Sequence, residues 1–264
     1  MAVSPGKRPT LPTRSRRPPP EPSADTAHEL RSFGRRRGRK FSARQRELLD
    51  EGLPRLALDL NAACPRSFSA VFPVPTSALW LEIGFGGAEH LVWQARHNRE
   101  IGLIGCEVFD DGVIKAVSAV EEHGLANIRL STDDARDVLR WLPQASLQRV
   151  FILFPDPWPK KRHVKRRLVS RALFDLLARV MAPGAELRIA TDIGDYARTI
   201  LRAARDHPAF AWQAESPQDW RERGPDWPET RYEAKARGEG RRCYFLRFLR
   251  TRAAAATIPL PAAS

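Results

Sequence analysis

The stretch LEIGFGG, residues 81–87, decides the fold of this 264-residue chain. It completes an apolar run, Ala78–Ile83, and leads into a helical pattern that starts near Ala88. Glycines at such a strand-to-helix turn let the backbone approach a ligand that faces the helix N-terminus. A dinucleotide-binding turn would carry a third glycine where Glu89 stands. The turn therefore favours a nucleotide-like ligand other than a nicotinamide dinucleotide.

Apolar runs alternate with helical patterns after this turn, as expected for a parallel sheet. We predict the later strands at residues 101–108, 127–131, 149–154, 185–190 and 243–249. We predict helices at residues 43–60, 88–96, 110–122, 167–181 and 196–206. The sequence therefore predicts an α/β fold that occupies residues 61–250.

Basic residues dominate the composition, with 44 Lys and Arg against 31 Asp and Glu and a formal net charge of +13. This surplus favours a polyanionic partner, with nucleic acid first. Residues 1–30 are rich in Pro and Arg and are expected to form a disordered tail. The segment RSFGRRRGRK, residues 31–40, opens a region 31–60 and is expected to be an RNA-facing arm or a solvated linker. Residues 251–264 are expected to be a flexible tail.

The rest of the composition narrows the class of protein. Cys64, Cys106 and Cys243 lie far apart without a metal-ligand spacing, so we expect no metal and a reducing compartment. No apolar run reaches the roughly 18 residues of a membrane span. A cytoplasmic protein without a membrane partner is expected.

Acidic side chains follow three successive strand ends. Glu82 lies two residues before the first glycine of the turn, Glu107 ends the second strand, and Asp133 and Asp134 follow the third. A carboxylate at the end of the second strand can reach both hydroxyls of a ribose, so Glu107 indicates an adenosine ligand. For each acid taken alone, a helix N-cap or a solvated surface position is the alternative.

The most specific stretch is FPDPWPKKRHVKRR, residues 154–167. Its prolines restrict the loop and hold Asp156 at the strand end, and Trp158 offers an aromatic face to an extruded base. Six Lys or Arg and no acid follow between Lys160 and Arg167. Such a run can contact several phosphates. A solvated helix face is the alternative for the basic run.

Over roughly residues 31–249 the chain resembles the bacterial tRNA (guanine-N7-)-methyltransferases, whose signature is the Phe-Pro-Asp-Pro-Trp stretch followed by basic residues. ATDIGDYA, residues 190–197, and PETRYEAKARGEG, residues 228–240, extend the resemblance. The departures from the family pattern are Ala88, Trp227, Arg231 and Tyr232.

The resemblance implies a Rossmann-like class I methyltransferase with a mostly parallel seven-stranded sheet, helices on both faces and a basic N-terminal extension. It implies transfer of a methyl group from S-adenosylmethionine to N7 of a guanine in tRNA, at position 46 of the variable loop, forming 7-methylguanosine. The partner is tRNA, and a monomer or a homodimer is expected.

The resemblance also implies roles for individual residues. Asp156 is the implied catalytic residue. The implied cofactor-binding residues are Glu82, Gly84, Gly86, Glu107, Asp134 and Asp156. The implied substrate-binding residues are Lys160, Asp192, Thr230, Arg231, Tyr232 and Glu233. The implied RNA-binding residues are Arg162, His163, Val164, Lys165, Arg166 and Arg167.

Two other functions stay open at this point. One is another RNA or DNA base methyltransferase, because Pro-Asp-Pro-Trp distantly resembles the Asn/Asp-Pro-Pro-Tyr loop of amino-group enzymes. The single proline between Asp156 and Trp158 disfavours it. The second is a non-catalytic RNA-binding module, which would leave Glu82 and Glu107 without a ligand to bind.

Overall fold

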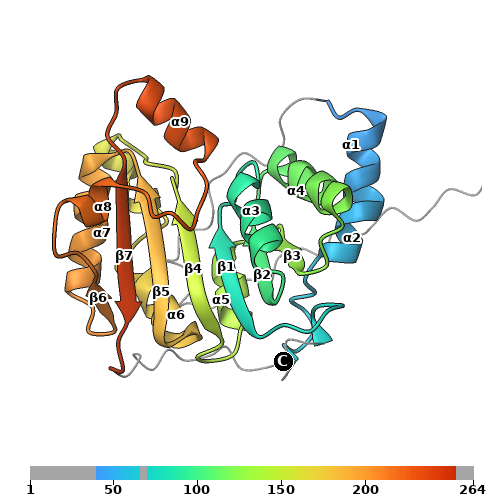
Figure 1. Ribbon diagram of the computed structural model, residues 1–264, viewed down its shortest axis with the longest axis horizontal. Coiled ribbons are helices and arrows are strands. Elements are labelled where there is room, and N and C mark those ends of the chain that lie inside the picture. The colour runs from blue at the N-terminus through green and yellow to red at the C-terminus, as the bar shows by residue number, and fades with distance from the viewer. Residues whose placement is uncertain (1–39, 66–69, 254–264) are drawn as a thin grey trace, which may run out of the picture. The chain divides into compact units, whose positions relative to one another are not determined.

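The computed structural model describes residues 40–65 and 70–253 (Figure 1). The predicted tail at 1–30, the basic arm up to residue 39 and residues 254–264 lie outside this part of the chain. The expected seven-stranded sheet is confirmed, with the order β3-β2-β1-β4-β5-β7-β6. The strands are β1 (Ala78–Ile83), β2 (Ile101–Cys106), β3 (Ile128–Ser131), β4 (Leu147–Leu153), β5 (Met181–Thr191), β6 (Phe210–Trp212) and β7 (Tyr244–Arg250). The sheet is mostly parallel, and β7 runs antiparallel to both of its neighbours.

Helical segments connect these strands. The α-helices are α1 (Ala43–Glu47), α2 (Leu53–Leu56), α3 (Glu89–His97), α4 (Asp110–His123), α5 (Ala135–Trp141), α6 (Arg171–Val180), α7 (Gly194–Arg205), α8 (Gln218–Arg221) and α9 (Arg231–Gly238). A π-helical turn, η1 (Leu48–Gly52), joins α1 to α2, and a 3-10 helix, η3 (Lys161–Arg166), precedes α6.

The side chains of β1 show why helices cover both faces of the sheet. Successive side chains of a strand point to opposite faces. Leu79, Leu81 and Ile83 are buried in a core that also contains side chains of α5, α6 and α7. Trp80 points to the other face, where α3, α4 and η1 pack over β2 and β3. The continuous apolar runs of the sequence are therefore those of a sheet buried on both sides.

The helix predicted for residues 43–60 is wrong in its extent. The helical segment ends at Leu56, and Ala57 has an extended backbone with φ −67° and ψ 137°. Ala57 forms a parallel bridge with Leu130, and the Leu58 N–H donates to the Leu130 carbonyl at 2.9 Å. The chain leaves the helix because the open edge of β3 offers these main-chain hydrogen bonds.

The helix predicted for residues 167–181 starts four residues later, at Arg171. Ser170 has an extended backbone, and its side chain accepts a hydrogen bond from the Leu173 N–H at 3.4 Å, which defines the start of α6. At the other end Met181 already belongs to β5. Four elements, α5, α8, α9 and β6, have no counterpart among those predicted from the sequence. In α9 only Glu233 and Ala236 are buried, so this helix shows no apolar period.

Candidate active site

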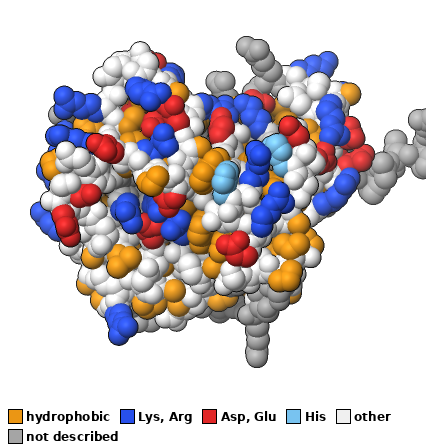
Figure 2. All heavy atoms as spheres, viewed as in Figure 1, with side chains coloured by type: hydrophobic (Ala, Val, Ile, Leu, Met, Phe, Trp, Pro, Cys, Tyr) orange, Lys and Arg blue, Asp and Glu red, His pale blue; other side chains and the backbone are white. Residues whose placement is uncertain are grey.

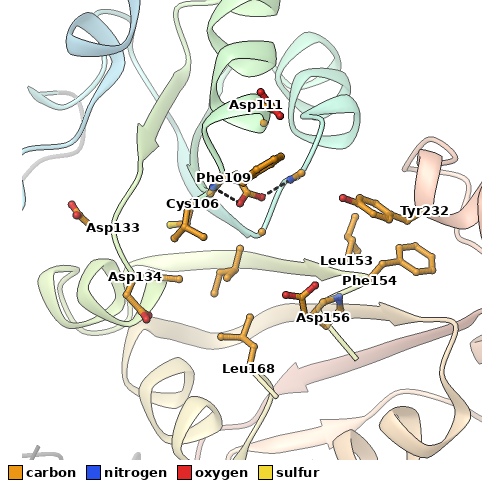
Figure 3. Close-up of a pocket in the computed structure, with 18 of the residues that line it drawn as sticks. Cys106, Phe109, Asp111, Asp133, Asp134, Leu153, Phe154, Asp156, Leu168 and Tyr232 are labelled. Atoms are coloured by element: carbon orange, nitrogen blue, oxygen red, sulfur yellow. Dashed lines mark hydrogen bonds between the residues drawn. The ribbon is translucent and has the colours of Figure 1, made fainter. Parts of the chain in front are cut away.

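A cavity of about 640 Å³ lies at the carboxyl ends of β1 to β4, where the strand order reverses between β1 and β4 (Figure 3). Ligands of open α/β sheets bind at this switch point, and the volume is in the range of cofactor sites. The lining residues are Ile83, Gly84, Gly86, Cys106, Glu107, Val108, Phe109, Asp111, Gly112, Lys115, Asp133, Asp134, Ala135, Arg136, Leu153, Phe154, Pro155, Asp156, Trp158, Arg166, Leu168, Arg231 and Tyr232.

The glycine-rich turn after β1 has a left-handed backbone at three positions. The φ angles are 75° at Gly84, 54° at Gly86 and 66° at Ala88. A side chain at Gly86 would meet the Tyr232 ring at 3.0 Å, so the turn needs glycine there for space as well as for conformation. Ala88 is a departure from the family pattern, and its left-handed φ gives the physical reason why a glycine suits this position.

Glu107 ties the glycine-rich turn to the start of α4. Its carboxylate oxygens accept hydrogen bonds from the Gly86 and Phe109 N–H groups, each at 2.9 Å. Burial raises the pKa of Glu107, and the backbone N–H groups oppose that shift. Because each carboxylate oxygen has a second lone pair, the group can still accept hydrogen bonds from a ligand in the cavity.

Gly112, in the first turn of α4, is a site residue that the sequence analysis missed. A Cβ there would lie 2.3 Å from the Gly86 carbonyl oxygen and 3.0 Å from Cγ of Glu107. The absent side chain is what lets α4 approach the turn this closely. A glycine inside a helix costs about 1 kcal/mol relative to alanine. Its presence in a predicted helix was therefore the sequence signal for a close approach at this position.

Asp133 and Asp134 lie at the end of the cavity away from Asp156 (Figure 3). The Asp134 carboxylate caps α5 by accepting the Arg136 N–H at 2.9 Å, and it forms an ion pair with the Arg136 guanidinium at 2.8 Å. Asp133 is exposed. Asp134 is therefore a helix N-cap, which was the alternative interpretation of this residue, and it also lines the cavity.

Glu82 does not line the cavity but lies buried under the turn, with 2% of its side chain exposed. Its Oε2 is 2.7 Å from Nδ1 of His90, and Nε2 of that ring is 3.1 Å from Nε2 of Gln94. The same Gln94 amide donates to the Asp226 carbonyl at 2.9 Å. This buried row of polar groups joins β1 and α3 to the segment that leads into α9.

The loop after β4 carries Asp156 to the cavity, where its carboxylate is exposed. No hydrogen bond or ion pair holds this carboxylate among residues 40–65 and 70–253. Arg167 holds the loop from behind: its Nε donates to the Pro157 carbonyl at 2.9 Å, and its other nitrogens bind Thr199 at 3.1 Å and Asp195 at 2.8 Å. The loop is therefore fastened to α7.

The basic run after this loop divides by exposure. Arg162 and Lys165 are exposed, and His163, Val164 and Arg166 are half-buried. The Arg166 guanidinium lies 5.1 Å from the centre of the Trp158 ring and lines the cavity. Arg167 differs, because only 3% of its side chain is exposed and its guanidinium faces protein groups. For Arg167 an RNA contact stays a prediction, and its geometry favours a positioning role.

Of the predicted substrate-binding residues, Arg231 and Tyr232 line the cavity. Thr230 caps α9 by accepting the Glu233 N–H at 3.2 Å, and the buried Glu233 carboxylate pairs with Arg223 at 3.1 Å. Both residues hold the start of α9 in place without reaching the cavity.

Asp192 and Lys160 also lie outside the lining. Asp192 follows β5 and accepts a hydrogen bond from Nε of Arg241 at 2.7 Å. Lys160 is exposed, and its carbonyl accepts the His163 N–H at 2.7 Å at the start of η3. Contacts of these side chains with a nucleotide stay predictions.

Two further observations concern the part of the chain that the structure describes. It contains no cluster of three or more His, Cys, Asp or Glu side chains arranged to hold a metal ion. None of its helices combines the length and the apolar character needed to cross a membrane.

Comparisons with known proteins agree with one another. A family model described as "Putative methyltransferase" matches residues 76–246. The tRNA (guanine-N(7)-)-methyltransferase of Rhodospirillum rubrum is 50% identical over 238 residues, which cover 88% of this chain and 91% of the relative. The enzyme of the same name from Brucella abortus (strain 2308) is 45% identical over 230 residues, covering 86% of this chain and 99% of the relative.

Proposed function

Because the chain belongs to the tRNA (guanine-N(7)-)-methyltransferase family, we propose that it transfers the methyl group of S-adenosylmethionine to N7 of a guanine in tRNA. The proposal extends to the target at position 46 of the variable loop and to the cytoplasm as the place of action. The observation that carries it is that two residues line the same cavity: Glu107, at a ribose-binding position, and Asp156, on the exposed loop after β4.

The residues around the cavity fit S-adenosylmethionine. Glu107 presents a fixed carboxylate at the second strand end, where it can accept hydrogen bonds from both ribose hydroxyls. A Cβ at Gly84 would meet no atom within 4 Å, so its backbone borders open space in which the amino-acid end can lie. Asp134 lines the cavity after β3, where its carboxylate can accept a hydrogen bond from the adenine amino group. When bound, this cofactor supplies an electrophilic methyl group on a sulfonium.

Guanine N7 bears a lone pair and no proton, so the protein needs no general base. Asp156 instead accepts hydrogen bonds from the N–H edge of the ring, and its negative charge offsets the positive charge that develops on the purine. Arg167 keeps the carboxylate in place through the Pro157 carbonyl. Positioning and electrostatics are then the main contributions of these side chains to the rate.

The charge distribution supports tRNA as the partner. Residues 1–39 contain ten Lys and Arg against three Asp and Glu, and the run at 160–167 adds six more basic residues. On the face shown in Figure 2, Lys and Arg side chains are interspersed with Asp and Glu side chains. The support therefore comes from the exposed basic run after β4, where Arg162 and Lys165 can contact phosphates.

The two alternative functions have less support. A non-catalytic RNA-binding module would not require the Glu107 carboxylate at the cavity or the close approach of Gly112 to the Gly86 carbonyl, since both features shape a cofactor site. Amino-group chemistry requires removal of a proton from the attacking nitrogen, and the loop after β4 has the Asp156-Pro157-Trp158 order of the N7 family.

Product analysis tests the proposal. Purified protein is incubated with S-adenosylmethionine and unmodified tRNA, and the tRNA is digested to nucleosides and separated by chromatography. We expect 7-methylguanosine as the new nucleoside. A methylated adenosine or cytidine would establish the amino-group alternative, and no methylated nucleoside together with tight tRNA binding would establish the binding module.

A further inference from the structure

Two aromatic side chains face each other at one end of the cavity (Figure 3). Phe154 comes from the loop after β4 and Tyr232 from the first turn of α9. Their ring centres are 6.5 Å apart, and their planes differ by 22°. A planar base between two rings needs about twice the 3.5 Å carbon contact distance, which is close to the observed distance between the ring centres.

The backbone of Phe154 is strained in a way that directs its ring to this end of the cavity. Its φ is 52°, a left-handed value that is unfavourable for a bulky L-residue. In β4, Val150 and Ile152 face the core with α6, and simple alternation would send Phe154 to that face. Phe154 instead packs against the cluster of Leu153 on the opposite face, while its N–H donates to the Ala190 carbonyl at 2.8 Å.

Tyr232 is held over the cofactor turn from the other side. A Cβ on Gly86 would lie 3.0 Å from Cε2 of the Tyr232 ring, so this ring rests on the turn backbone. Arg231 occupies the space above Gly87, and its Nε pairs with Glu89 at 2.7 Å. The slot between the two rings therefore adjoins both the turn and Asp156, which is where a methyl acceptor has to lie.

We infer that Phe154 and Tyr232 hold the purine ring of the target guanine between their faces, an inference that rests on the proposed function. Methylation at N7 makes the purine cationic, and aromatic faces attract a cation more strongly than a neutral ring. The slot thus stabilises the transition state and the product more than the substrate base, which is the condition for a faster chemical step. It also retains the product after methyl transfer.

Ligand discrimination tests the slot in the full chain. The probes are guanosine 5′-monophosphate and its 7-methyl derivative, each titrated at saturating S-adenosylhomocysteine. We expect the wild-type protein to bind the methylated nucleotide about tenfold more tightly, the size of a partly desolvated cation–π contact. Tyr232→Leu and Phe154→Leu should lose this preference, and Tyr232→Phe should keep most of it because the aromatic face remains.

The matched control is Trp212→Leu, which removes an aromatic side chain on β6 with 44% of its surface exposed, outside the site. Single-turnover methylation at saturating cofactor should fall at least tenfold in the two slot variants and stay at the wild-type rate in the control. Tyr232 is 45% exposed, so its variant tests the slot even if Phe154→Leu fails to fold.

An unchanged nucleotide preference and an unchanged single-turnover rate in Tyr232→Leu would overturn the slot while leaving the proposed function intact. A wild-type protein that forms no 7-methylguanosine in tRNA would instead refute the proposed function itself. The two failures are therefore separable.

Discussion

Replacing Arg167 by methionine removes the guanidinium and keeps most of the side-chain volume. The hydrogen bonds to the Pro157 carbonyl and the Thr199 hydroxyl are each worth about 1.5–3 kcal/mol, as bonds from a charged donor. The pair with Asp195 adds little, because 63% of that carboxylate side chain is exposed. The guanidinium also lies 4.7 Å from the centre of the Tyr196 ring. We expect a loss of about 3–6 kcal/mol in the free energy of unfolding, the sum of the two hydrogen bonds.

For a domain of this size that loss lowers the thermal midpoint by roughly 6 to 24 °C, which differential scanning calorimetry measures directly. The loop also loses its fastening, so single-turnover methylation by the folded variant should slow. The slope of log affinity for tRNA against log salt should stay unchanged, because Arg167 does not face solvent.

Arg162→Met is the matched control, since Arg162 is exposed on the same basic run. Its free energy of unfolding should stay within about 0.5 kcal/mol of wild type, while its salt slope flattens by about 0.7 to 0.9. A wild-type midpoint combined with a flattened salt slope in Arg167→Met would refute the positioning role and make Arg167 a phosphate contact.

Glu107→Ala should weaken S-adenosylmethionine binding by about 1.5–3 kcal/mol in calorimetry. Since burial raises the pKa of Glu107, wild-type cofactor affinity should decline on acidification at a higher pH than an ordinary glutamate would give, and a flat profile would argue against the ribose contact. Asp156→Asn should slow single-turnover methylation by about two to three orders of magnitude with little change in cofactor affinity, and a near-wild-type rate would leave Asp156 a loop-shaping residue. Gly112→Ala should push the glycine-rich turn aside and weaken cofactor binding, whereas Gly238→Ala, where a Cβ meets no atom within 4 Å, should not; equal affinities would contradict the close-approach argument. Burial lowers the pKa of His207 in the folded protein, so its contribution to the free energy of unfolding should be fully present above about pH 6.5 and should be lost as the pH falls below that value. In urea titrations, His207→Gln should reduce this loss of stability at low pH.

The sheet could be predicted from the sequence because its signals are local. The first strand was predicted at its observed bounds, Ala78–Ile83, because the apolar run begins at the first of these residues and the glycine-rich turn follows the second. Glu107 and Asp134 could be placed on the cavity because strand ends of a parallel sheet meet at one edge. The confirmed fold thus followed from periodicity and from the resemblance together.

The parts that were not predicted depend on contacts between distant segments. Arg167 belongs to a run of basic residues, and nothing in that run shows that Thr199 and Asp195 of α7 surround its guanidinium. The end of α2 depends on hydrogen bonds with the free edge of β3. Thr230 caps α9, a helix whose sequence has no apolar periodicity by which it could have been predicted. Local patterns do not contain these partners.

The most direct test of methyl transfer to N7 uses two tRNA transcripts that differ at one atom. One carries guanine at position 46 of the variable loop, and the other carries 7-deazaguanine, which has a C–H in place of the attacking nitrogen. Incorporation of labelled methyl from S-adenosylmethionine is measured for both under single-turnover conditions. We predict one methyl group per guanine transcript and none in the 7-deaza transcript, and equal labelling of the two transcripts would contradict the account.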